Sequence, residues 1–494
     1  MSSAIYRDRM KPSLAGTAAA LVLTVVMTLG MVVLWAGSAA AADEAGFEAE
    51  MLTLTPGFDE CSLYFNWYSD KAEGLRSDID VAKKSGMTGD VFPVPTILAA
   101  GPVGDATDGK CWHGVLVLNL EYDTEYVYRL SNDGNVKSRT YSFKTGTEGS
   151  FQFIAVGDPQ LTTGMQSADS INIPLVTTKA GWQNTLDAIS KLAPNARFLA
   201  SLGDQVDGSA DIETEYANFI APLQSRSLPV APTMGNHDGN MAFSHHFFVP
   251  NDKILYSLPG ENIYGSYWYT YNNVLFVVLN SSMSPTTAAE LAPYIQWMDE
   301  TLDDATRDHP DADWIVVQHH KSTASPARHQ SDRDILLLTP AFENLMDKYG
   351  VDVVLAGHDH VYSRSFFLYD HKVVGGIDYT ANTVTNPGGT LYMTLNTASG
   401  QKYYDILTSA PFGGPVWNSA GTKPYYTNVG IQVRAPQFTT VDVTGASMTF
   451  TTYRSDTEEI LDTYTIVKTS GDTDPAETDP EDDAPIPGIP ASGR

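Results

Sequence analysis

Five short motifs of chemically reactive residues occur in a fixed order along the chain. They are Gly157-Asp158-Pro159-Gln160, Gly203-Asp204-Gln205-Val206-Asp207, Gly235-Asn236-His237-Asp238, His319-His320 and Gly357-His358-Asp359-His360. Four of them come after an apolar run of strand length, and the third follows the mixed segment Leu228–Met234. Because open α/β sheets gather functional side chains at the carboxyl ends of their strands, the motifs are expected to meet at one place.

The residue types in these motifs are those that hold divalent metal ions. Aspartate supplies a hard anionic oxygen, asparagine and glutamine supply amide oxygens, and histidine supplies a ring nitrogen. Two ligand sets are expected to share Asp204: Asp158, Gln160, Asp204 and His360 in one, and Asp204, Asn236, His319 and His358 in the other. Two ions about 3.5–4 Å apart polarise a phosphoryl oxygen and lower the pKa of a bound water, so the motifs predict phosphoester hydrolysis.

His237 is adjacent to an expected ligand but belongs to neither set. It is therefore predicted to donate a proton to the leaving alkoxide, and Asp238 is predicted to orient its ring.

The fourth motif contains two adjacent histidines on an expected strand. Their side chains must point to opposite faces, so only one is expected to bind metal. We predict that this ligand is His319, and His320 is the alternative.

The motif set resembles that of the calcineurin-like metallophosphoesterases, whose pattern is Asp-x-His, Gly-Asp-x-x-Asp, Gly-Asn-His-Asp/Glu, a lone His and Gly-His-x-His. The resemblance covers roughly residues 150–467. It implies metal ligands at Asp158, Asp204, Asn236, His319, His358 and His360, and a phosphate-contacting acid at His237. The run from Gly357 to Arg364 and the β-rich segment at the front also resemble secreted enzymes near the purple acid phosphatases. Phosphomonoesters are therefore the expected substrates, with phosphodiesters as the alternative.

Two positions depart from the family pattern. Gln160 stands where the family usually has histidine, which makes the first site richer in oxygen. Asp207 stands where the purple enzymes use a tyrosine ligand, so their colour and ferric preference are not expected. Mn²⁺ or Fe²⁺ suits this oxygen-rich ligation, and Zn²⁺ suits the second site.

Three further side chains are candidates for contact with a ligand or the substrate. Asp207 is predicted to orient a metal ligand. Tyr362 and Arg364 follow the last motif, and either could touch a phosphate oxygen, with an ordinary ion pair or core contact as the alternative.

The remaining sequence predicts the scaffold. Residues 43–148 alternate apolar and polar positions without a helical period, as in a small all-β sandwich that resembles a fibronectin type III domain. Residues 149–468 repeat strand, motif loop and helix, which predicts an α/β (α+β) domain with a two-layered β-sandwich flanked by helices. Thr339-Pro340 reads as the start of a helix that ends at Gly350. Residues 469–494 are acidic and rich in proline, which predicts a disordered tail.

The N-terminal residues 1–42 predict export. Basic residues precede a long apolar stretch and a run of alanines, as in a cleaved signal peptide, with a retained membrane anchor as the alternative. The protein is thus expected to be secreted or held at the cell surface. In that oxidising setting Cys61 and Cys111 are predicted to form a disulfide, with two buried free thiols as the alternative.

The formal net charge of the chain is −29. Such a charge repels nucleic acid, so none is expected as a partner. Bound divalent cations would supply the local positive charge that a phosphorylated small-molecule or surface substrate needs.

Overall fold

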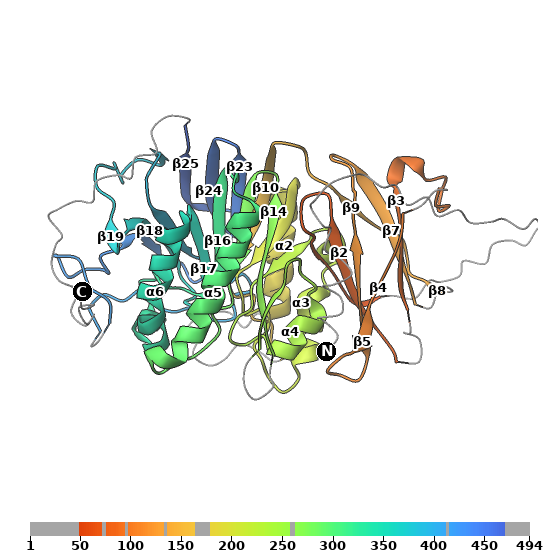
Figure 1. The fold of residues 1–494 in the computed structure, drawn as a ribbon, viewed down its shortest axis with the longest axis horizontal. Helices are drawn as coiled ribbons and strands as arrows, with labels where there is room; N and C mark the ends of the chain where they lie inside the picture. The colour runs from red at the N-terminus through yellow and green to blue at the C-terminus, as the bar shows by residue number, and fades with distance from the viewer. Residues whose placement is uncertain are drawn as a thin grey trace, which may run out of the picture. The chain divides into compact units, whose positions relative to one another are not determined.

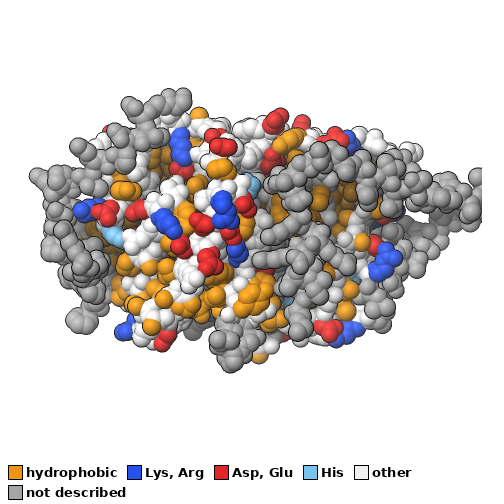
Figure 2. Space-filling view, viewed as in Figure 1, with side chains coloured by type: hydrophobic (Ala, Val, Ile, Leu, Met, Phe, Trp, Pro, Cys, Tyr) orange, Lys and Arg blue, Asp and Glu red, His pale blue; other side chains and the backbone are white. Residues whose placement is uncertain are grey.

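The computed structural model describes residues 49–71, 76–93, 97–132, 136–163, 178–256, 262–411 and 414–469. The predicted signal segment and nearly all of the predicted tail lie outside the described residues. Among those that are described, no helix is both long enough and apolar enough to span a bilayer. On the face drawn in Figure 2, lysine and arginine side chains lie beside acidic ones.

The N-terminal part is an all-β sandwich of two antiparallel sheets (Figure 1). One sheet contains β1 (Glu50–Pro56), β2 (Leu63–Ser69), β6 (Cys111–Val117) and β5 (Val103–Asp105). The other contains β4 (Ile97–Gly101), β3 (Ser77–Lys83), β7 (Glu125–Asn132), β8 (Val136–Lys137) and β9 (Tyr141–Lys144). Their alternating apolar residues, including Phe65, Trp67 and Tyr128, fill the space between the sheets. This part fits the predicted fibronectin-like domain.

Two larger sheets form the second part. The first runs β12 (Val230–Pro232), β11 (Ala196–Ser201), β10 (Ser150–Val156), β23 (Gln437–Thr444), β24 (Ser447–Arg454), β25 (Ile460–Val467) and β20 (Thr383–Thr385). The second runs β13 (Lys253–Tyr256), β14 (Asn262–Tyr271), β15 (Val274–Val278), β16 (Trp314–Lys321), β17 (Val353–Gly357), β21 (Thr390–Thr394), β18 (Tyr362–Tyr369) and β19 (Lys372–Val373), with β22 (Thr427–Ile431) paired to β18. One apolar core lies between these sheets and contains Phe153, Phe276 and Leu355.

Helices cover the outer face of each sheet, as the predicted fold class requires (Figure 1). The first sheet is covered by α2 (Thr178–Leu192), α3 (Ile212–Ile220) and α4 (Asn240–His246). The second is covered by α5 (Ala288–Asp308) and α6 (Arg333–Tyr349). Three short 3-10 helices complete the described elements: η1 (Lys84–Gly86), η2 (Leu223–Arg226) and η3 (Arg328–Ser331).

Each strand that precedes or carries a motif is parallel to at least one of its neighbours. β10, β11 and β12 are parallel in the first sheet, and β15, β16, β17 and β21 are parallel in the second. Parallel strands end at the same edge, so each sheet delivers its motifs to one edge. Two glycines let the loops touch. A Cβ at Gly357 would lie 2.5 Å from Asp158 Oδ2, and one at Gly235 would lie 2.1 Å from the Asp204 nitrogen.

The predicted disulfide is wrong, because Cys61 and Cys111 are free in the structure. Strand register gives the reason. Cys111 pairs with Ser69 at one end of β2, whereas Cys61 lies beyond Leu63 at the other end. At about 3.3 Å per residue, a β2 strand of this length separates them by roughly 20 Å. A disulfide needs Cα atoms within about 7 Å.

The predicted start of the last helix is also wrong. α6 begins at Arg333, so Pro340 lies inside it, while Gly350 ends it with a left-handed φ of 62° as predicted.

Candidate metal centre

Five of the predicted ligands have an unusual backbone conformation. Positive φ angles occur at Asp158 (40°), Gln160 (41°), Asp204 (50°), His358 (72°) and His360 (45°). For a residue with a Cβ such a conformation costs on the order of 1–3 kcal/mol and persists where surrounding structure imposes it, often at functional sites. The loops after β10, β11 and β17 are thus held in a backbone conformation that positions the predicted ligands at a cost in local conformational stability.

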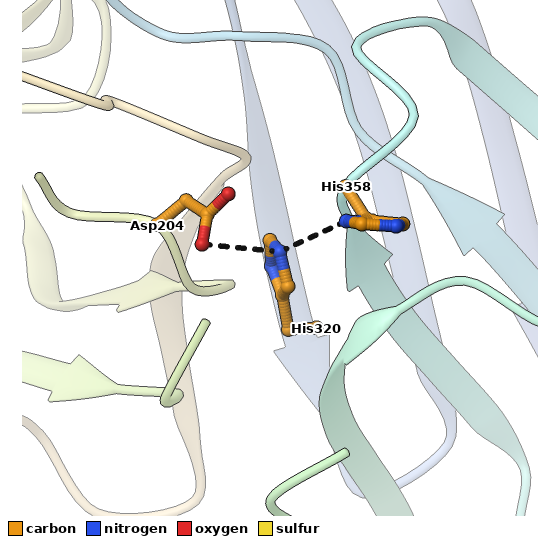
Figure 3. Close-up of side chains that lie close together, drawn as sticks. All are labelled: Asp204, His320 and His358. Atoms are coloured by element: carbon orange, nitrogen blue, oxygen red, sulfur yellow. Dashed lines mark hydrogen bonds and ion pairs between the residues drawn. The ribbon is translucent and has the colours of Figure 1, made fainter. Parts of the chain in front are cut away.

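The second predicted ligand set converges on one point, with His320 in the place predicted for His319. Ligand atoms of Asp204, His320 and His358 all lie within 4.8 Å of one another (Figure 3). His320 Nε2 lies 3.3 Å from Asp204 Oδ1, 3.2 Å from Asn236 Oδ1 and 3.3 Å from His358 Nδ1. One carboxylate, one amide and two imidazoles therefore face a common centre.

The first predicted ligand set lies beside it. His360 Nε2 is 3.4 Å from Asp158 Oδ1, and His360 Nδ1 donates to the Lys402 carbonyl at 2.9 Å. That bond fixes the ring and leaves Nε2 directed at the carboxylate. The Gln160 amide is fully buried, and neither its oxygen nor its nitrogen has a hydrogen-bond partner among the described residues. The Gln160 nitrogen of the main chain donates to the Asp204 carbonyl at 2.7 Å, which joins the two sets.

These residues fit bound divalent cations. Burial raises the pKa of Asp158 to about 8, so its carboxylate is held where a negative charge is costly. Burial also lowers the pKa of His358 and of His360, which keeps both rings neutral as metal binding requires. A buried carboxylate, neutral imidazoles and an unpartnered amide are all stabilised when a cation is present.

The prediction of His319 as a ligand is wrong. Its ring stacks on Phe342 of α6 with centroids 4.3 Å apart, and burial lowers its pKa to about 3. His320 takes the place at the centre, and its Nδ1 donates to the Leu202 carbonyl at 2.8 Å. Burial alone would lower the pKa of His320, yet Asp204 and Asp158 raise it to about 9. Only one of the two histidines reaches the centre, as their positions on a strand require.

His237 is placed to act on a bound phosphate. Its Nδ1 donates to the Asp207 carbonyl at 2.7 Å, and its Nε2 lies 3.8 Å from Asp204 Oδ2. The side chain is 32% exposed, whereas that of Asp204 beside it is 2% exposed. One ring nitrogen is thus fixed by the backbone, and the other faces the centre at its open side.

The predicted role of Asp238 is wrong, because its carboxylate does not contact the His237 ring. It accepts instead from main-chain nitrogens of Gly235 (2.7 Å), Asp204 (3.0 Å) and Gln205 (2.7 Å). Asp238 therefore fixes the backbone of two motif loops. Asp207 orients the His237 ring through its carbonyl, while its own carboxylate accepts from Gln401 at 3.3 Å.

Comparison with known proteins identifies this part of the chain. The family model of the calcineurin-like phosphoesterases matches residues 151–362, which include the motifs from Asp158 to His360. These residues form a calcineurin-like phosphoesterase domain. The comparisons confirm the predicted family, the fold class and the prediction of a metallophosphoesterase enzyme.

The alignments with similar proteins cover more of the chain than this domain. Acid phosphatase type 7 of Mus musculus is 24% identical over 336 residues, which cover 65% of this chain and 70% of the relative. The Homo sapiens protein of the same name is 25% identical over 335 residues, with the same two coverages. A solved purple acid phosphatase from yellow lupin superposes with a TM-score of 0.63 at 15% identity, over 85% of this chain and 74% of that one. Its likeness shows that the folds agree.

Tyr362 and Arg364 lie outside the metal centre of the phosphoesterase domain. The Tyr362 hydroxyl donates to Asp462 of β25 at 2.7 Å, and Arg364 Nε donates to the same carboxylate at 2.8 Å. Arg364 also lies over the Tyr464 ring, 3.9 Å from its centroid. Both residues therefore join the two sheets, which agrees with the alternative of an ion pair or core contact and not with substrate contact.

Arg364→Met is expected to destabilise the phosphoesterase domain by about 3 kcal/mol, because Asp462 loses its buried cation. Urea unfolding would measure this loss, and kcat of the folded variant should stay near wild type. Arg307→Met is the control, since its pair with Asp303 lies on the exposed side of α5. Equal effects of the two substitutions, or a large loss of kcat in the folded Arg364 variant, would contradict this placement.

His329 was missed by sequence reasoning. Its ring packs on His358 with centroids 4.3 Å apart, and its Nδ1 lies 2.7 Å from Asp332 Oδ2. It belongs to no motif, and only its position in the loop after β16 could have indicated a place near the centre. Tyr404 was missed for the same reason, although its ring contacts both His329 and His360.

Proposed function

We propose that the chain is a secreted phosphohydrolase that uses two divalent metal ions to cleave phosphomonoesters. The observation that carries this proposal is the convergence of Asp204, His320 and His358, with the Asn236 amide beside them. Asp158, His360 and the unpartnered Gln160 amide support a second ion next to the first. The acid phosphatases among the relatives favour monoesters over diesters.

The ions, as Mn²⁺, Fe²⁺ or Zn²⁺, would polarise the phosphoryl group and lower the pKa of an attacking water. His237 Nε2 faces the open side of the centre and would donate the proton that the leaving alkoxide needs. The Asp207 carbonyl accepts from Nδ1 and so directs Nε2 toward the substrate. Asp238 holds the motif loops in place through their main-chain nitrogens, and burial of the carboxylates limits the access of bulk water.

Turnover of an aryl phosphomonoester and an aryl phosphodiester, with Mn²⁺ and with a chelator, tests the proposal. We expect chelator-sensitive turnover of both or of the monoester alone, with the monoester preferred. Preference for the diester would favour a phosphodiesterase of the same fold. Folded protein without chelator-sensitive turnover of either compound would overturn the enzymatic proposal in favour of a non-catalytic surface binding protein.

We also propose that residues 1–42 direct export and that residues 43–148, 149–468 and 469–494 are the sandwich domain, the phosphoesterase domain and the tail. The basic, apolar and alanine-rich order of the N-terminal residues supports export. Mature protein in the culture medium should begin near Asp43. Full-length protein found only in membranes would contradict cleavage and favour an uncleaved anchor.

A further inference from the structure

A loop outside the five motifs is fixed to the metal centre. The Lys402 carbonyl accepts from His360, and Gln401 Nε2 donates to Asp207. Gln432 then bridges the loop and the last motif, because its amide donates to the Tyr404 carbonyl at 2.7 Å and to the His360 carbonyl at 2.8 Å. The loop from Gln401 to Tyr404 therefore keeps a defined position beside the centre.

This loop and the segment before His329 bring two cations together. Lys402 Nζ and the guanidinium carbon of Arg328 each lie 5.7 Å from the centroid of the Tyr404 ring. The same ring contacts His360, with centroids 5.2 Å apart, and His329, at 5.0 Å. Tyr404 thus holds an ammonium and a guanidinium next to the residues that would bind the metal ions and the phosphate.

Neither cation forms an ion pair with a carboxylate in the described part of the chain, where lysines and arginines elsewhere pair widely. Arg328 is exposed and Lys402 is half-buried. Two neighbouring cationic side chains without an ion pair are unexpected in a protein with a net charge of −29, because acidic side chains are abundant.

The charge balance at the proposed metal centre also favours an anion near these two cations. With two divalent ions bound, the carboxylates of Asp158 and Asp204 would neutralise only half of their charge. The dianion of a phosphomonoester would neutralise the rest. Lys402 already has part of a counter-charge in the Asp207 carboxylate, whose pKa is raised by burial, an effect that Lys402 opposes. Arg328 has none in the described part of the chain, so a further anionic group on the substrate would complete the balance.

We propose that Arg328 and Lys402 form a second anion subsite, so that the preferred substrates are phosphomonoesters with a further phosphate or carboxylate group. Tyr404 is the positioning residue that holds the two cations. This subsite rests on the proposed function and adds a substrate class to it.

Three matched substrates test the subsite: phenyl phosphate, 4-carboxyphenyl phosphate and 1,4-phenylene bisphosphate. In the double variant Arg328→Gln/Lys402→Gln, kcat/KM for the two doubly anionic substrates should fall about ten- to a hundredfold, mainly through KM. For phenyl phosphate it should stay within about twofold. The relative sizes of the carboxylate and phosphate effects identify which group the subsite prefers.

Lys348→Gln is the control, because Lys348 also lies over a tyrosine ring but on α6 and paired with Asp299. Equal losses for all three substrates in the double variant, or no loss, would overturn the subsite. Absence of turnover of phenyl phosphate by the metal-loaded wild type would instead overturn the proposed function. Metal content of the double variant, which should match wild type, separates lost substrate contact from a damaged centre.

Discussion

His320→Ala is expected to lose most of its bound metal and to turn over an aryl phosphate at least about a hundredfold more slowly than wild type. The side chain lies within 3.3 Å of the Asp204 and Asn236 oxygens, so its removal takes a ligand from the centre. Loss of a group that merely orients a ligand costs ten- to a hundredfold in metal affinity or activity, and loss of the ligand should cost no less. Metal content by mass spectrometry and turnover with added Mn²⁺ measure the two effects.

His319→Ala is the matched control, one residue away on the same strand. It removes a ring that packs on Phe342, so it should lower the free energy of unfolding by ~2 kcal/mol and leave metal content unchanged. Circular dichroism would show that both variants are folded. Loss of metal in His319→Ala, with metal retained in His320→Ala, would reverse the assignment of the ligand.

His237→Ala is expected to lower kcat for an alkyl phosphate by a factor of about 10²–10⁴ while metal content stays near wild type. The Nε2 atom faces the centre from its open side, and Nδ1 is held by the Asp207 carbonyl. Because the proposed role is protonation of the leaving group, the loss should be small for a nitrophenyl phosphate and large for an alkyl phosphate. The acidic nitrophenol leaves without a proton, and the alcohol does not.

His245→Ala is the control for that substitution. His245 lies on α4, close to His237 in the chain, and stacks on Trp112 of the N-terminal sandwich. Its kcat should stay within about twofold of wild type. A loss in His237→Ala that is equal for both leaving groups, or that accompanies loss of metal, would show that His237 does not act as the acid.

Sequence patterns could predict the strands and the order of the motifs. Each motif combines a short apolar run with a turn and residues that fit a metal centre. The ends of β10, β11, β16 and β17 could therefore be predicted from the sequence. The sequence could not predict which of His319 and His320 is the metal ligand, because β16 is buried on both faces. Val316 packs between the sheets and Val317 packs under α5 and α6. Because both faces of the strand are apolar, the sequence does not indicate which face carries the metal ligand.

Other wrong predictions concern features that depend on contacts between residues far apart in the sequence. The register of β2 and β6 separates the cysteines, and nothing in the local sequence encodes that register. Arg364 pairs with Asp462, which lies 98 residues further along the chain. Thr339-Pro340 has the composition of a helix start, but the preceding turns of α6 pack against the second sheet and the helix continues through the proline.

The number of metal ions that each chain retains tests the central claim most directly. Chelated protein would be reconstituted with Mn²⁺, freed of excess ion, and analysed by mass spectrometry against protein concentration. The ligand sets around Asp158 and Asp204 predict two ions per chain and turnover that returns with them. Folded protein that retains no ion, or whose turnover survives complete chelation, would contradict the account.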